Sequence, residues 1–151
     1  MSSSTTTTER LAALITTKQQ VLEILVQLSR RQLALIGAGE MTTLLKLLAG
    51  KQTVMNQLQT LERELTPFRD EDPERRVWTS PQERTACQVR AEQCNALLAE
   101  AMDLEKRAEA AMVERRQAAA TALAAVQAGA NARAAYDAIP PTLLASLQME
   151  G

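Results

Sequence analysis

Apolar side chains recur in steps of three and four along the first half of the chain, which is the spacing of one face of an α-helix. The first stripe predicts a helix over about residues 9–37, with positions Leu11, Leu14, Ile15, Leu22, Leu25, Leu28, Leu35 and Ile36. Gly37 and Gly39 predict its end, because glycine adopts the left-handed C-cap conformation at little cost. The Ser/Thr run over residues 1–8 is expected to be disordered.

A second stripe predicts a helix over about residues 41–66, with positions Met41, Leu44, Leu45, Leu48, Met55, Leu58, Leu61 or Glu62, and Leu65. The connection between the two stripes is only about three residues long, so the helices are expected to turn back as an antiparallel hairpin. Pro67 predicts the end of the second helix, because proline lacks the amide donor. In the polar loop 67–79, Phe68 and Trp78 are expected to pack together in preference to lining a ligand pocket.

Ser80, Pro81 and Glu83 predict the start of a third helix, because they suit the N-cap, the first helical position and the capping box. Its stripe is Cys87, Ala91, Cys94, Leu97, Leu98, Ala101, Leu104, Ala108 and Met112, and alanine-rich sequence continues to about residue 128. The predicted fold is all-α: an antiparallel three-helix coiled-coil-like bundle in one domain over residues 9–128, followed by a flexible, partly helical interaction tail over residues 129–151.

The predicted third helix is longer than its partners. At 1.5 Å per residue it reaches roughly 72 Å, whereas the first two helices cover only about 40 Å of it. Its far end is therefore expected to lack a partner within the chain. Four aliphatic residues lie around Pro140 and Pro141: Ile139 comes before them, and Leu143, Leu144 and Leu147 come after them. This apolar segment either binds another protein or folds back on the exposed part of the third helix, and both alternatives stay open.

The composition excludes several kinds of catalytic and metal site. Aromatic residues make up only 2% of the chain and histidine is absent. Without histidine, neither a Ser-His-Asp nor a Cys-His arrangement can form, and the Glu-x-x-His site of di-iron bundles is excluded. Cys87 and Cys94 would lie about 10 Å apart on a helix, too far for a disulfide, and two cysteines are too few for a zinc site. We expect no enzyme, no metal and no cofactor, and interpret both cysteines as buried small hydrophobes.

Charge and hydropathy bear on the partners. The net charge of −1 gives no electrostatic basis for binding nucleic acid or anionic lipid. The N-terminal run has neither the charged nor the apolar region of a secretory signal. No stretch reaches the ~18 uninterrupted apolar residues that a membrane-spanning helix needs. The expectation is a soluble, cytoplasmic protein without membrane insertion.

The hairpin QLALIGAGEMTTLL over Gln32–Leu45 resembles the FlgN family of flagellar export chaperones, and the related FliT chaperones share much of the pattern. The similarity extends over about residues 10–136 and also includes Leu48, Lys51, Gln52, Met55, Leu58, Leu61, Glu62, Cys94–Leu98, Leu104, Glu105, Ala135 and Tyr136. The alanine content of residues 108–138 and the long loop bearing Trp78 depart from the family.

The resemblance implies a chaperone for hook–filament junction proteins, which are flagellar hook-associated proteins awaiting type III export. It would bind their helical C-terminal segments and deliver them to the export gate. The family places these contacts in the last helix and the tail, which implies a partner-binding set of Leu123, Val126, Tyr136, Ile139, Leu143, Leu144 and Leu147. Tyr136 falls where the family tends to place a tyrosine, and so becomes a candidate for contact with the export gate.

Two other functions remain open. The first is a structural or adaptor coiled coil that forms a homodimer or larger homo-oligomer through the unpaired end of the third helix. The second is a small-molecule-binding helical regulator. That function needs a cavity lined with polar groups, whereas the stripes consist almost entirely of aliphatic residues, alanine and cysteine.

Overall fold

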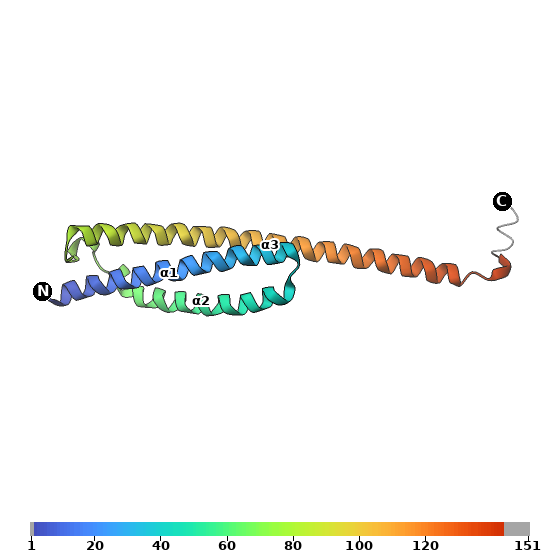
Figure 1. The fold of residues 1–151 in the computed structure, drawn as a ribbon, viewed down its shortest axis with the longest axis horizontal. Coiled ribbons are helices and arrows are strands. Elements are labelled where there is room, and N and C mark those ends of the chain that lie inside the picture. The colour runs from blue at the N-terminus through green and yellow to red at the C-terminus, as the bar shows by residue number, and fades with distance from the viewer. Residues whose placement is uncertain (1, 144–151) are drawn as a thin grey trace. The chain divides into compact units, whose positions relative to one another are not determined.

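The computed structural model describes residues 2–143 and contains three long α-helices and no β-strand in that range. Helix α1 spans Ser2–Ala38, α2 spans Met41–Arg69 and α3 spans Pro81–Asp137. A short 3-10 helix, η1, spans Pro73–Arg75 in the connection between α2 and α3. The all-α prediction is confirmed (Figure 1).

Helix α1 includes the Ser/Thr run, which corrects the prediction that residues 1–8 are disordered. Ser2 to Thr8 are helical, and the Thr8 side chain is only 3% exposed. Its hydroxyl lies 2.7 Å from the carbonyl oxygen of Val77, in the connection between α2 and α3, and 2.9 Å from that of Thr5. Threonine is a modest helix former, so this tertiary contact outweighs the local preference. Met1 lies outside the described residues.

The turn between α1 and α2 is a Schellman motif, as the glycine signal predicts. Gly39 adopts a φ of 75°, the left-handed conformation that glycine favours. The Gly39 N–H donates to the Ile36 carbonyl at 3.2 Å, and the Glu40 N–H donates to the Leu35 carbonyl at 3.0 Å. These two bonds satisfy carbonyls at the end of α1 that would otherwise have no helical partner.

Helix α2 runs back along α1 (Figure 1). Near the turn, the Lys51 ammonium donates to the Gln32 side-chain oxygen at 2.7 Å. Farther from the turn, the Lys18 ammonium lies 2.7 Å from the Glu62 carboxylate. Lys51 and Gln32 are both buried, so this hydrogen bond satisfies polar groups that would be costly to bury alone.

Helix α2 continues through Pro67 to Arg69, which corrects the predicted end at residue 66. Proline removes one amide donor from a helix and crowds the preceding turn. Here Phe68 is buried, and the Arg76 guanidinium donates to the Phe68 carbonyl at 2.6 Å. The packing of Phe68 and this hydrogen bond stabilise the final turn of the helix.

Helix α3 begins where the capping signal predicts and ends later than predicted. The Glu83 N–H donates to the Ser80 hydroxyl at 3.2 Å, which confirms Ser80 as the N-cap. The helix continues past residue 128 and through Gly129 to Asp137. Glycine costs a helix only about 1 kcal/mol relative to alanine, and the flanking alanines are the strongest helix formers. The high alanine content therefore sustains the helix beyond the predicted end.

The main core is formed by α1, α2 and the N-terminal half of α3. Its buried residues are Val21, Leu22, Leu25, Val26, Leu58, Leu61, Cys94, Ala101 and Leu104. A second cluster consists of Leu11, Leu65 and Phe68, with Leu14, Ile15 and Trp78 packed against it. Phe68 and Trp78 therefore pack in one cluster, as expected from the sequence.

Some positions of the predicted stripes are not buried. Leu45 is 69% exposed, and Leu48 and Leu98 are also exposed, whereas Val21 and Val26 are buried. Helix α1 packs against both other helices, so it buries a wider arc than one predicted stripe covers. Helix α2 buries a correspondingly narrower face.

The chain divides into two compact units, Met1–Ala111 and Met112–Gly151. The boundary lies within α3, earlier than the predicted domain end at residue 128. The prediction placed the end of the third helix and the end of the packed domain at the same residue, 128. In the structure these differ, because alanine supports a helix without providing the large side chains that build a core.

Candidate functional site

Three of the predicted partner-binding residues lie on the part of α3 that belongs to the second unit. Leu123, Val126 and Tyr136 are 65%, 70% and 60% exposed. Every residue from Val113 to Ala138 is exposed. These large apolar side chains are flanked mainly by alanine, whose small size allows close approach of another helix.

The helical geometry sets how these three side chains are arranged. At about 100° per residue, Leu123 and Val126 lie about 60° apart on the helix surface. Tyr136 lies about 80° farther round and about 15 Å beyond Val126 along the axis. The three side chains therefore occupy one broad face of the helix, with two neighbouring aliphatics and one separate aromatic.

The remaining predicted residues follow α3. Ile139 is half-buried, and its N–H donates to the Tyr136 carbonyl at 3.1 Å. Leu143 is exposed, and its N–H donates to the Pro140 carbonyl at 3.0 Å. Leu144 and Leu147 lie outside the described residues, so their assignment stays a prediction.

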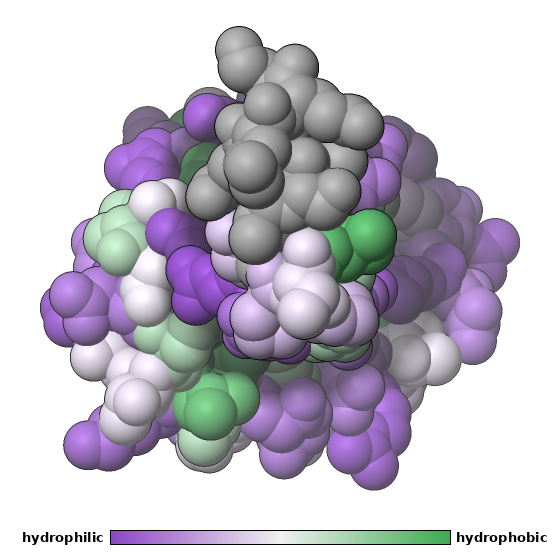
Figure 2. Space-filling model, turned by 90° about the vertical axis from the view of Figure 1, so that its right-hand side faces the viewer, coloured by the Kyte–Doolittle hydropathy of each residue, from purple (hydrophilic) through white to green (hydrophobic). Residues whose placement is uncertain are grey.

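Exposed hydrophobic side chains do not form one large patch on the face shown in Figure 2. That face is mainly hydrophilic, and its hydrophobic residues occur in small separate groups. Single exposed apolar residues are common on protein surfaces. On α3 itself, Tyr136 lies about 15 Å along the axis from Val126 with mainly alanine between them, so the exposed apolar residues are separate anchor points for a partner.

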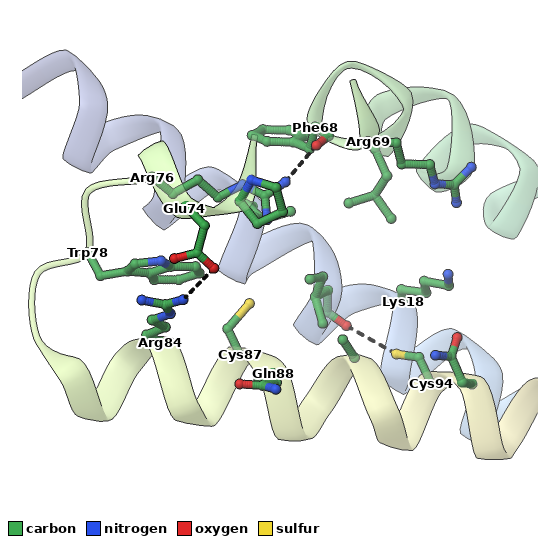
Figure 3. A pocket seen from close by; sticks show the side chains of 16 residues that line it. Lys18, Phe68, Arg69, Glu74, Arg76, Trp78, Arg84, Cys87, Gln88 and Cys94 are labelled. Atoms are coloured by element: carbon green, nitrogen blue, oxygen red, sulfur yellow. Dashed lines mark hydrogen bonds and ion pairs between the residues drawn. The ribbon is translucent and has the colours of Figure 1, made fainter. Parts of the chain in front are cut away.

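A cleft that the sequence did not predict lies at the end of the first unit where α2 connects to α3. Its volume is about 480 Å³, and α1, α2, the connection and α3 all contribute to its lining. Trp78 and Arg84 lie on one side of the cleft, and Phe68 and Arg76 on the other (Figure 3). Phe68 and Trp78 therefore belong to one packed cluster and also line a cleft, whereas the sequence interpretation treated packing and pocket lining as alternatives.

One sequence signal could have indicated this cleft. The predicted loop 67–79 exceeds the two to eight residues usual between helices of a bundle, and long loops are often functional. Arg75 and Arg76 of this loop also lie three and two residues before Trp78. What the sequence could not supply was the convergence of Lys18, Arg69 and Arg84, which come from three different helices.

The electrostatics of the cleft centre on Glu62. Its carboxylate lies 2.7 Å from the Lys18 ammonium and also forms an ion pair with Arg69. Burial alone would raise the pKa of Glu62, but the hydrogen bonds and charges of Lys18 and Arg69 outweigh it and lower the pKa below its ordinary value. The carboxylate is therefore ionised at neutral pH and holds two cations at the cleft.

Both cysteines are free and buried, as expected. The Cys94 thiol lies 3.7 Å from the Ile15 carbonyl oxygen, to which it donates. Burial raises the pKa of the Cys87 thiol, although Arg76 and Arg90 partly oppose the shift. Burial likewise raises the pKa of Cys94. Both thiols are therefore protonated at neutral pH, whereas a reactive cysteine needs the thiolate.

A second groove lies between α2 and α3 within the first unit. Its volume is about 470 Å³, and its lining includes Leu48, Met55, Leu98 and Met102. The buried Ser29 hydroxyl also lines it and has no hydrogen-bond partner among the described residues. The groove is mainly apolar and offers few groups that would orient a ligand.

Two further observations concern the described part of the chain. Residues 2–143 contain no group of three or more acidic or cysteine side chains placed to hold a metal ion. None of the helices described combines the length and apolarity needed to cross a membrane.

Comparisons with protein families, curated proteins and solved structures find no match for this chain.

Proposed function

We propose that this protein is a cytoplasmic export chaperone of the flagellar type, which binds helical C-terminal segments of hook–filament junction proteins and delivers them to the type III export apparatus. The observation that carries the proposal is the exposure of Leu123, Val126 and Tyr136 on one continuous helix. The resemblance of Gln32–Leu45 and the following leucines to the FlgN family supplies the class of partner.

The exposed side chains provide enough apolar surface for a moderate affinity. Burying a large aliphatic side chain contributes roughly 1.5–3 kcal/mol. Leu123 and Val126, with Tyr136 and Leu143, would together offset the ordering costs of association and support binding in about the micromolar range. Such an affinity suits a chaperone that must later release its substrate.

We also propose that the first unit is an antiparallel three-helix coiled-coil-like bundle that supports the binding helix. The Gln19 and Gln93 side chains are 2.8 Å apart, and Arg30 forms an ion pair with Glu100. Residue numbers thus rise together along α1 and α3, whereas α2 runs the opposite way. Buried small residues of α3 recur at the seven-residue interval of a heptad, namely Cys87, Cys94, Ala101 and Ala108. In this proposal the protein binds and positions a partner and catalyses no reaction.

The proposal is tested by titrating purified hook-associated proteins from the same organism into the full chain by isothermal titration calorimetry. The double substitution L123A/V126A should weaken one-to-one binding at least about tenfold, because it removes two apolar anchors. Val89→Ala is the matched control, since Val89 is an exposed aliphatic residue of the same helix within the first unit. No binding by any form, or equal binding by all three, contradicts the proposal.

The alternative is a structural or adaptor coiled coil, in which the same exposed face of α3 pairs with a second copy of the chain. Alanine-rich helices with a few large aliphatic residues also suit homo-oligomers. Sedimentation of the full chain distinguishes the two functions. A tight homodimer that L123A/V126A converts to a monomer, together with no binding of hook-associated proteins, would support the alternative.

A further inference from the structure

The cleft beside the α2–α3 connection carries an excess of cationic groups. Its lining contains Lys18, Arg69, Arg76 and Arg84 but only one carboxylate, that of Glu74. Two further carboxylates outside the lining, those of Glu62 and Glu71, pair with these cations. The four cations therefore outnumber the three carboxylates around them.

The arginines of the cleft also have hydrogen-bonding capacity to spare. Each guanidinium has five N–H donors. The Nε–H of Arg76 is shielded from solvent and has no hydrogen-bond acceptor among the described residues, and the nearest carboxylate oxygen, on Glu71, is 3.5 Å away. Arg69 shares the carboxylate of Glu62 with Lys18, so two cations depend on one acid. The guanidinium groups of Arg69 and Arg84 are the accessible ones, because both side chains are largely exposed, and each has more N–H donors than its single ion pair uses.

The ion pair of Arg84 is the one most easily exchanged. Its guanidinium lies 3.7 Å from the Glu74 carboxylate, and both side chains are largely exposed. Figure 3 shows this pair beside the indole ring of Trp78 at one side of the cleft. An ion pair this exposed is weakened by the surrounding water, so an incoming carboxylate can replace Glu74 at little cost.

The rest of the lining is apolar or uncharged. Phe68 and Trp78 contribute aromatic surface, and Leu11, Ile15 and Leu65 contribute aliphatic surface. Burial raises the pKa of the Cys87 thiol, so this thiol adds no negative charge at neutral pH. An apolar side chain can therefore pack in the cleft next to the group that its arginines bind.

We propose that this cleft is a second binding site, which takes an acidic segment of a protein partner through a carboxylate that lies next to an apolar side chain. The chain's own Glu62 and Glu74 already pair with these cations through carboxylates. The site goes beyond the proposed export function and uses none of the residues assigned to substrate binding.

Trp78 provides a direct probe, because it is the single tryptophan of the chain and lines the cleft. The full-length protein is titrated with a capped peptide of about twelve residues that carries repeated Glu-Leu pairs and no tryptophan. A matched peptide with glutamine in place of glutamate, and inorganic phosphate, are titrated separately. We expect a saturable change in Trp78 fluorescence with the acidic peptide alone, weakening as salt is added.

Arg84→Gln and Arg69→Gln should each weaken the acidic peptide about fivefold to tenfold, because each removes a charge-assisted hydrogen-bond donor. Arg90→Gln is the matched control: it makes the same charge change on α3, but Arg90 does not line the cleft. Circular dichroism confirms that each variant folds. Equal binding of the glutamate and glutamine peptides, equal affinity in all variants, or a response to phosphate without one to the peptide would overturn the proposal.

The two proposed sites fail independently. The export function is tested with hook-associated proteins and L123A/V126A, whereas the cleft is tested with a synthetic peptide and arginine variants. Loss of peptide binding in Arg84→Gln with hook-protein binding intact supports two separate sites. An Arg84→Gln variant that loses hook-protein binding but keeps full affinity for the peptide would contradict the assignment of Arg84 to the cleft site.

Discussion

Substituting Leu22 with alanine should destabilise the first unit strongly. Leu22 is 0% exposed and belongs to the core formed by all three helices. Shortening its isobutyl side chain to a methyl group loses about 2 kcal/mol of transfer free energy, and the cavity left among neighbours on three helices adds more. The expected loss in the free energy of unfolding is therefore about 3–4 kcal/mol. This is a large share of the 5–15 kcal/mol typical of a domain.

Urea unfolding monitored by Trp78 fluorescence measures this loss. Trp78 packs against the cluster of Leu11, Leu65 and Phe68, so its emission reports on the first unit, whereas circular dichroism also includes the helix of the second. With a denaturant dependence of about 1–3 kcal/mol/M, the midpoint should fall by on the order of 1–4 M.

Ile24→Ala is the matched control. Ile24 lies two residues farther along α1 but is 47% exposed, and alanine is the better helix former. Its midpoint should therefore change little. If Leu22→Ala and Ile24→Ala shift the midpoint equally, the assigned burial along α1 is wrong.

Three further predictions concern the N-terminal contact, the response to acid and the helix of the second unit. Thr8→Val should destabilise the first unit by about 1 kcal/mol, because it removes a buried hydroxyl that bonds to the Val77 carbonyl. Thr17→Val is the control and should have little effect, because the Thr17 hydroxyl is exposed and bonds within α1. Equal urea midpoints for the two variants would contradict this prediction. The pKa of Glu62 is lower in the folded state than its ordinary 4.5, so its contribution is complete at neutral pH and is lost as the pH falls through the folded value. The wild type should therefore lose up to about 1 kcal/mol more stability below about pH 4.5 than Glu62→Gln loses, and parallel pH profiles would refute it. Gly129→Ala should stabilise the surrounding helix by up to about 1 kcal/mol, because alanine is the better helix former and a β-carbon there meets no other atom within 4 Å. Hydrogen exchange of the neighbouring amides should therefore slow. The reverse change Ala128→Gly should make that exchange faster.

The sequence predicted the elements whose signals are local. The glycine turn at Gly39 and the cap at Ser80 were correct because both depend on nearby backbone bonds. The N-terminal start of α1 was missed, since Thr8 is held by Val77, which is remote in sequence. The end of α2 was missed because Phe68 is anchored by packing and by Arg76.

The candidate sites differ in the same way. Exposure of Leu123 and Val126 could be predicted, because the predicted third helix is longer than the first two and its far end was expected to lack a partner within the chain. The cationic cleft could not be predicted, because Lys18, Arg69 and Arg84 converge only when three helices pack. Periodicity finds the face of one helix, whereas a site shared by several helices depends on how they are placed.

The most direct measurement for the export function is calorimetric titration of hook-associated proteins into the full chain, the L123A/V126A variant and the Val89→Ala control. Leu123 and Val126 are largely exposed, so their substitution should leave the first unit folded while removing two anchors. We expect saturable one-to-one binding by the full chain and the control, with affinity at least about tenfold lower for the double variant. Unchanged binding by L123A/V126A, or no binding by the full chain, would contradict the assignment of α3 as the substrate-binding helix.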